Sequence, residues 1–269
     1  MKKVVISILA AIFLSFSPCA FSRIKWPAEK REVPPFQFAD NKELQFIEIE
    51  EGVEKIGEYA FLGCENLVEV ILPSTLKQIG EGAFRECSSL KSLIIPEKVE
   101  VIPPYMCAWD SALVSVTLPY NLKDIGRSAF ADCINLEEIN IPDSVRHIGP
   151  NVFNDCRSLT GIILPSGLEE LESYAFAGCF SLKKVTLPAN DRMLGELLFT
   201  GCESLEEIVC LSPTPPVFDC DSPLFDPSED EMYKKCRLVV LPDAEASFRV
   251  AEVWKNFFKR GESRSYPSN

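Results

Sequence analysis

Cysteine is the residue type with the most evident chemistry in this chain, which has 11 of them. Six recur at multiples of 23 residues: Cys64, Cys87, Cys133, Cys156, Cys179 and Cys202. Side chains in one column of stacked strands point the same way and lie about 4.8 Å apart, whereas a disulfide needs converging Cβ atoms about 3.8 Å apart. Zinc needs four ligands that meet at one point. We therefore expect buried free thiols in this column. Whether a disulfide forms among Cys210, Cys220 and Cys236, which lie outside it, stays open.

The single histidine and a run of carboxylates are the other residues that could do chemistry. His147 occupies a variable position, and no serine or cysteine can be paired with it, so we expect it on the surface. The carboxylates near the C-terminus are Asp219, Asp221, Asp226, Glu229, Asp230 and Glu231. Oxygen ligands of this kind suit calcium, but the spacing matches no calcium-binding loop and favours a solvated one. We predict no catalytic, cofactor-binding or metal-binding residues, and a chain that is not an enzyme.

The six regularly spaced cysteines belong to a repeat of 23 residues that aligns without a gap over seven rows. Four rows read IGEYAFLGCENLVEVILP, IGEGAFRECSSLKSLIIP, IGRSAFADCINLEEINIP and IGPNVFNDCRSLTGIILP. The conserved spacing is seen in the leucine column: Leu67, Leu90, Leu113, Leu136, Leu159, Leu182 and Leu205. Such periods are typical of solenoids, in which each coil buries its apolar side chains against its neighbours.

Each row predicts a strand, a turn and a return segment. The segment L-x-x-V-x-L-P is rich in β-branched residues and ends at a proline, which cannot donate to a ladder. A second extended piece ends in Ile-Gly, and A-F-x-x-C has helical spacing. We predict an α/β repeat solenoid with one long parallel β-sheet face, a short helical or irregular convex side and a C-terminal cap. Leu136 and Phe153 should be fully buried.

One column of the strand should face solvent, because the Leu, Val and final Leu of L-x-x-V-x-L point to the core. It reads Glu48, Ile71, Ile94, Thr117, Asn140, Ile163, Thr186 and Val209. Four of these eight residues are Ile or Val. Strand propensity alone explains them in one interpretation. In the other, an apolar stripe contacts a partner, and the candidate ligand-binding residues are Ile71, Ile94, Thr117, Asn140, Ile163 and Thr186.

The N-terminus has the pattern of a cleaved signal peptide. Lys2 and Lys3 precede the apolar stretch Val4–Phe16, which is shorter than the roughly 20 residues needed to span a bilayer. Cys19 raises the alternative of a lipid anchor, but Pro18 stands before it, where Gly, Ala or Ser is expected. We expect an exported protein: secreted, periplasmic or on the cell surface.

The mature chain should be acidic. Removal of Lys2 and Lys3 takes the formal charge from −13 to −15, which argues against nucleic acid and anionic membranes as partners. No membrane span is expected. The domain organisation we predict is a signal peptide at 1–22, an N-terminal cap at 23–43, repeats at 44–211 and a C-terminal cap at 212–269.

The C-terminal cap should seal the last coil. A solenoid exposes its final apolar coil unless a cap covers it. We predict a strand at Arg237–Leu241 and a helix at Asp243–Phe258, whose apolar residues have nearly helical spacing. Asp243 should cap the N-terminus of that helix, and Trp254 should be buried.

The rows resemble the BspA-type leucine-rich repeats, a 23-residue class on surface proteins of anaerobic bacteria and some protists. The resemblance covers about Leu44 to Leu211, and the segment RLVVLPDAEASFRVAEVW resembles the cap of that family. The third coil departs from the pattern, with Pro103 for Gly, Cys107 for Phe and Asp110 for Cys. The resemblance implies an extracellular adhesion or binding protein without catalysis. It supplies no binding residue.

Three functions remain to be compared. The first is an exported, non-catalytic protein that binds a protein or a glycan through its repeat surface. The second is a structural or accessory surface module with no specific ligand. The third, a hydrolytic enzyme, would require two facing carboxylates in a cleft.

Overall fold

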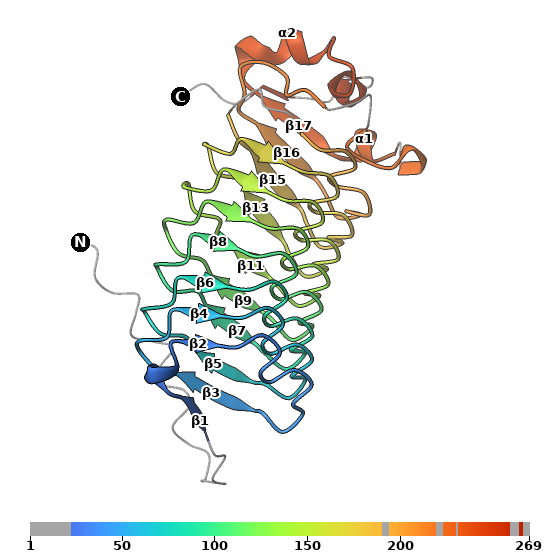
Figure 1. The fold of residues 1–269 in the computed structure, drawn as a ribbon. Helices are drawn as coiled ribbons and strands as arrows, with labels where there is room; N and C mark the ends of the chain where they lie inside the picture. The colour runs from blue at the N-terminus through green and yellow to red at the C-terminus, as the bar shows by residue number, and fades with distance from the viewer. Residues whose placement is uncertain (1–22, 190–193, 219–222, 230, 259–263, 266–269) are drawn as a thin grey trace, which may run out of the picture.

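The computed structural model describes residues 23–189, 194–218, 223–229, 231–258 and 264–265. The proposed signal peptide, Cys220 and the carboxylates Asp219, Asp221 and Asp230 lie outside these residues. The described chain is a stack of coils with strands running across it (Figure 1). One short helix, η1 (Ala28–Lys30), lies at the N-terminal end of the stack, and the other short helices lie at the C-terminal end. The predicted solenoid of leucine-rich-repeat type is confirmed.

The main sheet holds the predicted L-x-x-V-x-L strands, one from each coil. Its strands are β1 (Ile24–Trp26), β3 (Phe46–Ile49), β5 (Glu69–Ile71), β7 (Ser92–Ile94), β9 (Ser115–Thr117), β11 (Glu138–Ile139), β13 (Gly161–Ile163), β15 (Lys184–Leu187), β16 (Glu207–Cys210), β17 (Arg237–Val240) and β18 (Arg264–Ser265). All pairings are parallel. From β1 to β16 the paired residues are 23 apart, as in Ile163 beside Thr186, whereas β17 pairs with β16 at an offset of 30, as in Val209 beside Val239. No ladder pairing joins β5 to β7 or β11 to β13 in the described chain, so the face has two interruptions.

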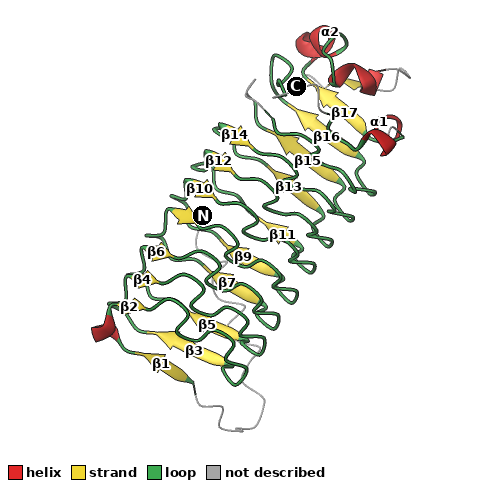
Figure 2. Ribbon diagram, turned by 45° about the vertical axis from the view of Figure 1, so that its right-hand side comes forward, coloured by secondary structure: helices red, strands yellow, loops and turns green. Residues whose placement is uncertain are grey.

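A second parallel ladder runs along the solenoid, which the expectation of one sheet face did not include. Its strands are β2 (Glu32–Val33), β4 (Lys55–Ile56), β6 (Gln78–Ile79), β8 (Val101–Ile102), β10 (Asp124–Ile125), β12 (His147–Ile148) and β14 (Glu170–Leu171). They are the second extended pieces of the coils, and β4, β6, β10 and β12 end in the Ile of an Ile-Gly pair. Figure 2 shows this ladder and the main sheet as two separate sets of strands in the same coils.

The glycine of the Ile-Gly pair is required by close stacking of the coils. A Cβ on Gly80 would lie 2.4 Å from the backbone nitrogen of Glu58, and one on Gly149 would lie 2.8 Å from that of Arg127. Contacts this short would force the backbone of two coils apart. The third coil has Pro103 at this position, and it is buried.

The convex side consists of turns, so of the two alternatives expected for it, short helical or irregular, the structure has the irregular one. Two residues of a typical coil have positive φ, as at Tyr59 (53°) and Gly63 (65°), or Asn151 (57°) and Asp155 (56°). A left-handed residue every fourth position is incompatible with a right-handed helix. Its backbone bonds run to the next coil instead, as from Phe153 N to Ala175 O at 2.8 Å.

The core is a set of columns that run the length of the stack. Leu136 and Phe153 are both fully buried, as predicted. The phenylalanines stack on one another, with ring centroids 5.7 Å apart from Phe130 to Phe153 and 5.4 Å from there to Phe176. Each coil therefore packs its core side chains against those of its neighbours.

The cysteine column is buried, with free thiols, as predicted. Each of the six Sγ atoms donates to a backbone oxygen 26 residues earlier, at 3.0 to 3.2 Å; for Cys156 the acceptor is Phe130 O. Burial raises the pKa of the Cys64 thiol to about 11 and that of Cys133 well above its usual range. Cys210 and Cys236 are free thiols as well. The hydrogen bonds of the column thus join adjacent coils.

We expect denatured, unreduced protein to titrate with at least the six column cysteines free. Because raised thiol pKa values suppress the thiolate, the folded protein should react with a thiol reagent far more slowly than the denatured one. Mass spectrometry of alkylated peptides reads out both. Paired column cysteines would contradict the stacking described above.

Asp110 replaces cysteine in the third coil and is fully buried. Its Oδ1 accepts a hydrogen bond from Cys87 N at 2.7 Å, while Oδ2 has no partner among the described residues. Burial raises the pKa of this carboxyl well above its ordinary value, with the Cys87 and Cys107 hydrogen bonds acting the other way. The third coil therefore departs from the repeat pattern by placing a buried carboxylic acid in the cysteine column.

The substitution Asp110→Cys should stabilise the protein by about 1–3 kcal/mol at pH 7, because it removes a buried group lacking a partner. The folded pKa of Asp110 is raised, so its contribution to stability is complete below the unfolded pKa and is lost as pH rises. The gain should therefore shrink towards pH 4. Urea unfolding of both proteins at the two pH values measures it, and a gain independent of pH would show that folding does not raise the pKa of Asp110.

The C-terminal cap is built around buried aromatic residues. The predicted strand is confirmed as β17. The predicted continuous helix is wrong: the chain forms η3 (Pro242–Ala244), α2 (Glu245–Phe248) and η4 (Trp254–Phe258), separated by turns. Asp243 lies within η3 and makes no capping hydrogen bond. The apolar residues that suggested one helix belong instead to these three short helices.

Trp254 is buried, as predicted, and anchors this cap. Its Nε1 donates to Pro216 O at 2.9 Å, and its ring meets Phe248 edge-on at 5.4 Å. Glu229 ties the cap to the last regular coil, accepting hydrogen bonds from Thr200 Oγ1 and Gly201 N, both at 2.9 Å. This use of Glu229 gives part of the acidic run a structural role.

Candidate binding face

The exposed column of the main sheet is the first candidate site. Ile94 and Ile163 are the most exposed of its apolar members, at 70% and 73%, and Ile71 is 38% exposed. Thr117 and Asn140 are also exposed, whereas Thr186 is half-buried. The six candidate residues thus share one face, as the alternation of the strand requires.

Two members of the column differ from the expectation. Val209 is buried rather than solvent-facing, because β17 from the cap lies beside it and its neighbour in register, Val239, is buried too. Glu48 is half-buried and forms an ion pair with Lys25, 3.3 Å away on β1. The exposed part of the column therefore begins at Ile71 and ends near Thr186.

The exposed apolar residues of the column form two separate groups rather than a continuous stripe. Ile71 and Ile94 lie on successive coils at one end, and Ile163 lies at the other, with Thr117 and Asn140 between them. Val68 and Val114, three residues before Ile71 and Thr117 in the same coils, are each 38% exposed. A surface of this kind offers apolar anchors with hydrogen-bonding groups between them.

A second outward-facing column lies two residues earlier on each strand, as the same alternation requires. It contains Glu69, Ser92, Ser115, Glu138, Gly161, Lys184 and Glu207. Glu69 pairs with Arg23 at 2.8 Å, and Lys184 pairs with Glu207 at 2.8 Å. Charges at both ends of the face are therefore matched between coils.

Glu207 accepts hydrogen bonds from two cations, since Arg237 donates to it as well as Lys184. Burial raises the pKa of Glu207, but hydrogen bonds from Lys184 and Arg237 outweigh this effect, so the pKa lies below its ordinary value. The carboxylate is therefore ionised at neutral pH and neutralises the nearby cations.

A hollow lies on this face where the ladder between β11 and β13 is interrupted. Its lining includes Glu138 and Asn140 from one coil, Gly161 and Ile163 from the next, and Thr186 from a third. A smaller hollow adjoins it around Glu137, Thr160 and Ser181, sharing Glu138. The face is thus recessed in the C-terminal half of the repeat region.

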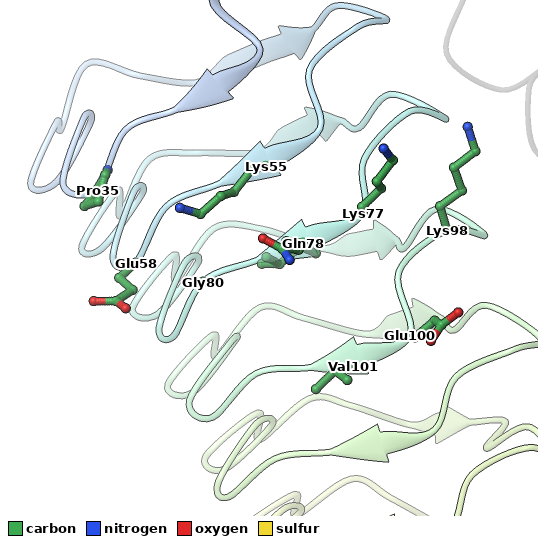
Figure 3. Close-up of a pocket in the computed structure, with 10 residues that line it drawn as sticks. Pro35, Lys55, Glu58, Lys77, Gln78, Gly80, Lys98, Glu100 and Val101 are labelled. Carbon is green, nitrogen blue, oxygen red and sulfur yellow. The ribbon is translucent and has the colours of Figure 1, made fainter.

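The second ladder has a hollow of its own over β4, β6 and β8, shown in Figure 3. Lys55, Lys77 and Lys98 border it, and their ammonium groups are spread along the face rather than directed at one point. Lys55 and Lys77 pair with Glu32 and Glu54, each at 2.9 Å. Because carboxylates neutralise these two, the hollow does not concentrate positive charge.

His147 lies exposed on the second ladder, as expected for a surface residue. Its Nδ1 is 2.6 Å from Asp124 Oδ1, and its Nε2 is 3.9 Å from Glu169 Oε2. The contact belongs to the column of the second ladder, in which β10 and β12 pair. In the described chain no three His, Cys, Asp or Glu side chains are grouped to hold a metal ion.

Comparison with known proteins agrees with this architecture. The model of the BspA type Leucine rich repeat region matches residues 14–136 and 101–214, and the chain belongs to this family. Proteins of this family are bacterial surface proteins, and leucine-rich repeats generally serve as binding modules. No curated protein matches the chain significantly. Among the described residues no helix is long and apolar enough to cross a membrane.

Several solved bacterial structures are similar to the chain. A leucine-rich repeat protein from Bacteroides ovatus is 26% identical with a TM-score of 0.56; the match covers 81% of this chain and 62% of that protein. The Treponema pallidum leucine-rich repeat protein is 30% identical, with a TM-score of 0.47 and coverage of 65% and 71%. A leucine-rich cell surface protein from Faecalibacterium prausnitzii is 21% identical, with a TM-score of 0.43 and coverage of 91% and 88%. The similarity to the Bacteroides ovatus structure supports the leucine-rich-repeat fold.

Proposed function

We propose that this protein is exported and binds a protein or glycan ligand through the exposed column of its main sheet, without catalysing a reaction. The observation that carries the proposal is the exposure of Ile94 and Ile163, at 70% and 73%, on one face of the main sheet. Isolated exposed apolar residues are common, but two on one ordered face suit anchoring contacts.

The size of the face also supports this function. The column from Ile71 to Thr186 crosses five strand spacings, which is about 24 Å at 4.8 Å each. Stable interfaces bury about 800 Å² on each partner, a patch of comparable width. Thr117 and Asn140 supply hydrogen-bonding groups between the apolar ends.

Export and domain organisation are part of the same proposal. The pattern of residues 1–22 supports a signal peptide, and the caps at 23–43 and 212–269 flank the repeats at 44–211. Lipidation at Cys19 would place the protein on a membrane surface without a span. The acidic charge disfavours nucleic acid as a partner.

The test is a protein and glycan array probed with three proteins. We expect Ile94→Asp/Ile163→Asp to fold with stability within about 1 kcal/mol of the wild type, since both positions are exposed. It should lose at least about tenfold in affinity for whatever the wild type binds. The control Val101→Asp/Val250→Asp makes the same charge change at exposed valines of the second ladder and the cap.

Retained binding by the face variant, or equal loss in the control, would place the ligand elsewhere. If the wild type binds nothing on the array, the accessory-module alternative is favoured and the isoleucines reflect strand propensity alone.

A further inference from the structure

The hollow between β11 and β13 has a feature that the fold does not require, a glycine at its centre. Gly161 has no positive φ, and a Cβ there would meet only Lys184 O, at 3.6 Å, an ordinary contact. This differs from Gly80, where a side chain would collide with backbone. At the same position other coils carry Glu69, Ser92 and Ser115 without difficulty. The backbone would accept a side chain at Gly161, and its absence leaves an open notch.

The charges around the notch are unbalanced. On one side Glu138 forms no ion pair with any described residue, and Asp143 lies on the same rim. On the other side Lys184 is engaged by Glu207 at 2.8 Å. The side chain that would normally separate Glu138 from Lys184 is missing. The notch therefore presents an unpaired carboxylate to solvent beside an ammonium group that is already neutralised.

The walls of the notch favour a long side chain over a bare ion. Ile163, 73% exposed, provides an apolar flank, and Asn140 and Thr186 provide oxygen acceptors in the adjoining coils. A guanidinium group binds a carboxylate through paired hydrogen bonds while its aliphatic stem packs on apolar surface. These walls match an arginine in charge, hydrogen bonding and apolar contact.

We propose that the notch at Gly161 receives an arginine side chain of a protein ligand, with its guanidinium group on Glu138 and its stem against Ile163. This inference rests on the proposed binding role of the sheet face and specifies the ligand as a protein with an exposed arginine. Attraction between this residue and Glu138 adds specificity to the apolar contacts elsewhere on the face.

The test uses a probe that requires no knowledge of the natural ligand. The isotope-labelled mature protein is titrated with N-acetyl-arginine methylamide, and backbone amide shifts are followed by NMR. N-acetyl-citrulline methylamide, which is neutral and nearly isosteric, is the matched probe. We expect saturable millimolar binding of the arginine probe that moves the amides of Gly161 and Ile163, and at least about fivefold weaker binding of the citrulline probe.

Two pairs of variants localise the effect. Glu138→Gln should lower the affinity for the arginine probe to that for the citrulline probe. Glu206 is an exposed carboxylate in another coil of the same face, and Glu206→Gln should leave the affinity unchanged. Gly161→Gln should fill the notch and abolish the shift at Ile163, whereas Ser92→Gln, at the same position three coils earlier, should not. Both glutamine substitutions are at positions where the backbone tolerates a side chain, so folding is preserved.

Equal binding of arginine and citrulline, shifts centred away from the notch, or binding that survives Gly161→Gln would overturn the inference. A neutral methyl glycoside that binds the notch in place of arginine would also overturn it and point to a glycan. Failure of the proposed function has a different signature, because there the array ligand remains bound to Ile94→Asp/Ile163→Asp.

Discussion

Truncation of the chain after Leu241 is expected to turn the protein into an aggregating species. It removes Phe248, Trp254 and Phe257, all buried in the cap. A buried aromatic side chain accounts for about 150–250 Å² of surface, so the exposed last coil would present a large apolar patch. The ends of solenoids must be sealed for solubility. Size-exclusion chromatography with light scattering should show large oligomers in place of the species formed by the intact chain.

The matched control is truncation after Ser265, which keeps β18 and all described contacts of the cap. It should behave as the full chain does. If the protein truncated after Leu241 elutes like the intact chain and unfolds cooperatively at an unchanged midpoint, the cap does not seal the solenoid and its aromatic cluster has another role.

Leu136→Ala should lower the free energy of unfolding by about 2–5 kcal/mol, because it opens a cavity in a fully buried column. Leu136 belongs to the central coil of the repeat region, between the leucines of two neighbouring coils. Each coil is stabilised mainly by its neighbours, so a cavity here weakens two interfaces. Urea denaturation followed by circular dichroism measures the change.

Glu137→Ala is the control for that substitution, since Glu137 is adjacent in sequence but exposed on the sheet face. A surface change of this kind should alter stability by less than about 0.5 kcal/mol. A loss below about 1 kcal/mol for Leu136→Ala, or equal losses for both, would contradict the facing of the strand.

The repeat made the core and the faces of the main sheet predictable. A column such as Leu67 to Leu205 appears in every coil, so one alternation argument applies to all of them. The same logic predicted the free thiols, because stacked cysteines such as Cys133 and Cys156 point the same way. The second ladder was harder, since its strands have only two residues and carry little pattern of their own.

Spacing alone was misleading where the backbone adopts left-handed conformations. Tyr59 has a side chain that does not indicate a positive φ. Asn151 and Asp155 belong to residue types that tolerate one, but the spacing of A-F-x-x-C left a short helix and an irregular segment as alternatives. In the cap, apolar residues at helical spacing serve three short pieces, because they pack around Trp254 rather than along one axis. Context of this kind is not present in a local window of sequence.

The candidate site was predicted in part for a similar reason. Exposure of Ile94 and Ile163 follows from alternation, but the burial of Val209 depends on a cap strand that comes from 30 residues further along. Gly161 was missed because glycine in a strand is usually ascribed to the backbone. Only the space around its Cβ shows that the backbone does not need it there.

The most direct test of the binding face is hydroxyl-radical footprinting of the protein with and without the ligand found on the array. The reaction labels exposed side chains, and the two faces offer matched reporters. Ile94 and Ile163 lie on the main sheet, whereas Val101, 49% exposed, and Phe36, 57% exposed, lie elsewhere. The sheet-face account predicts that the ligand suppresses labelling of Ile94 and Ile163 and leaves Val101 and Phe36 unchanged. Suppression at Val101 or Phe36, with full labelling of both isoleucines, would contradict it.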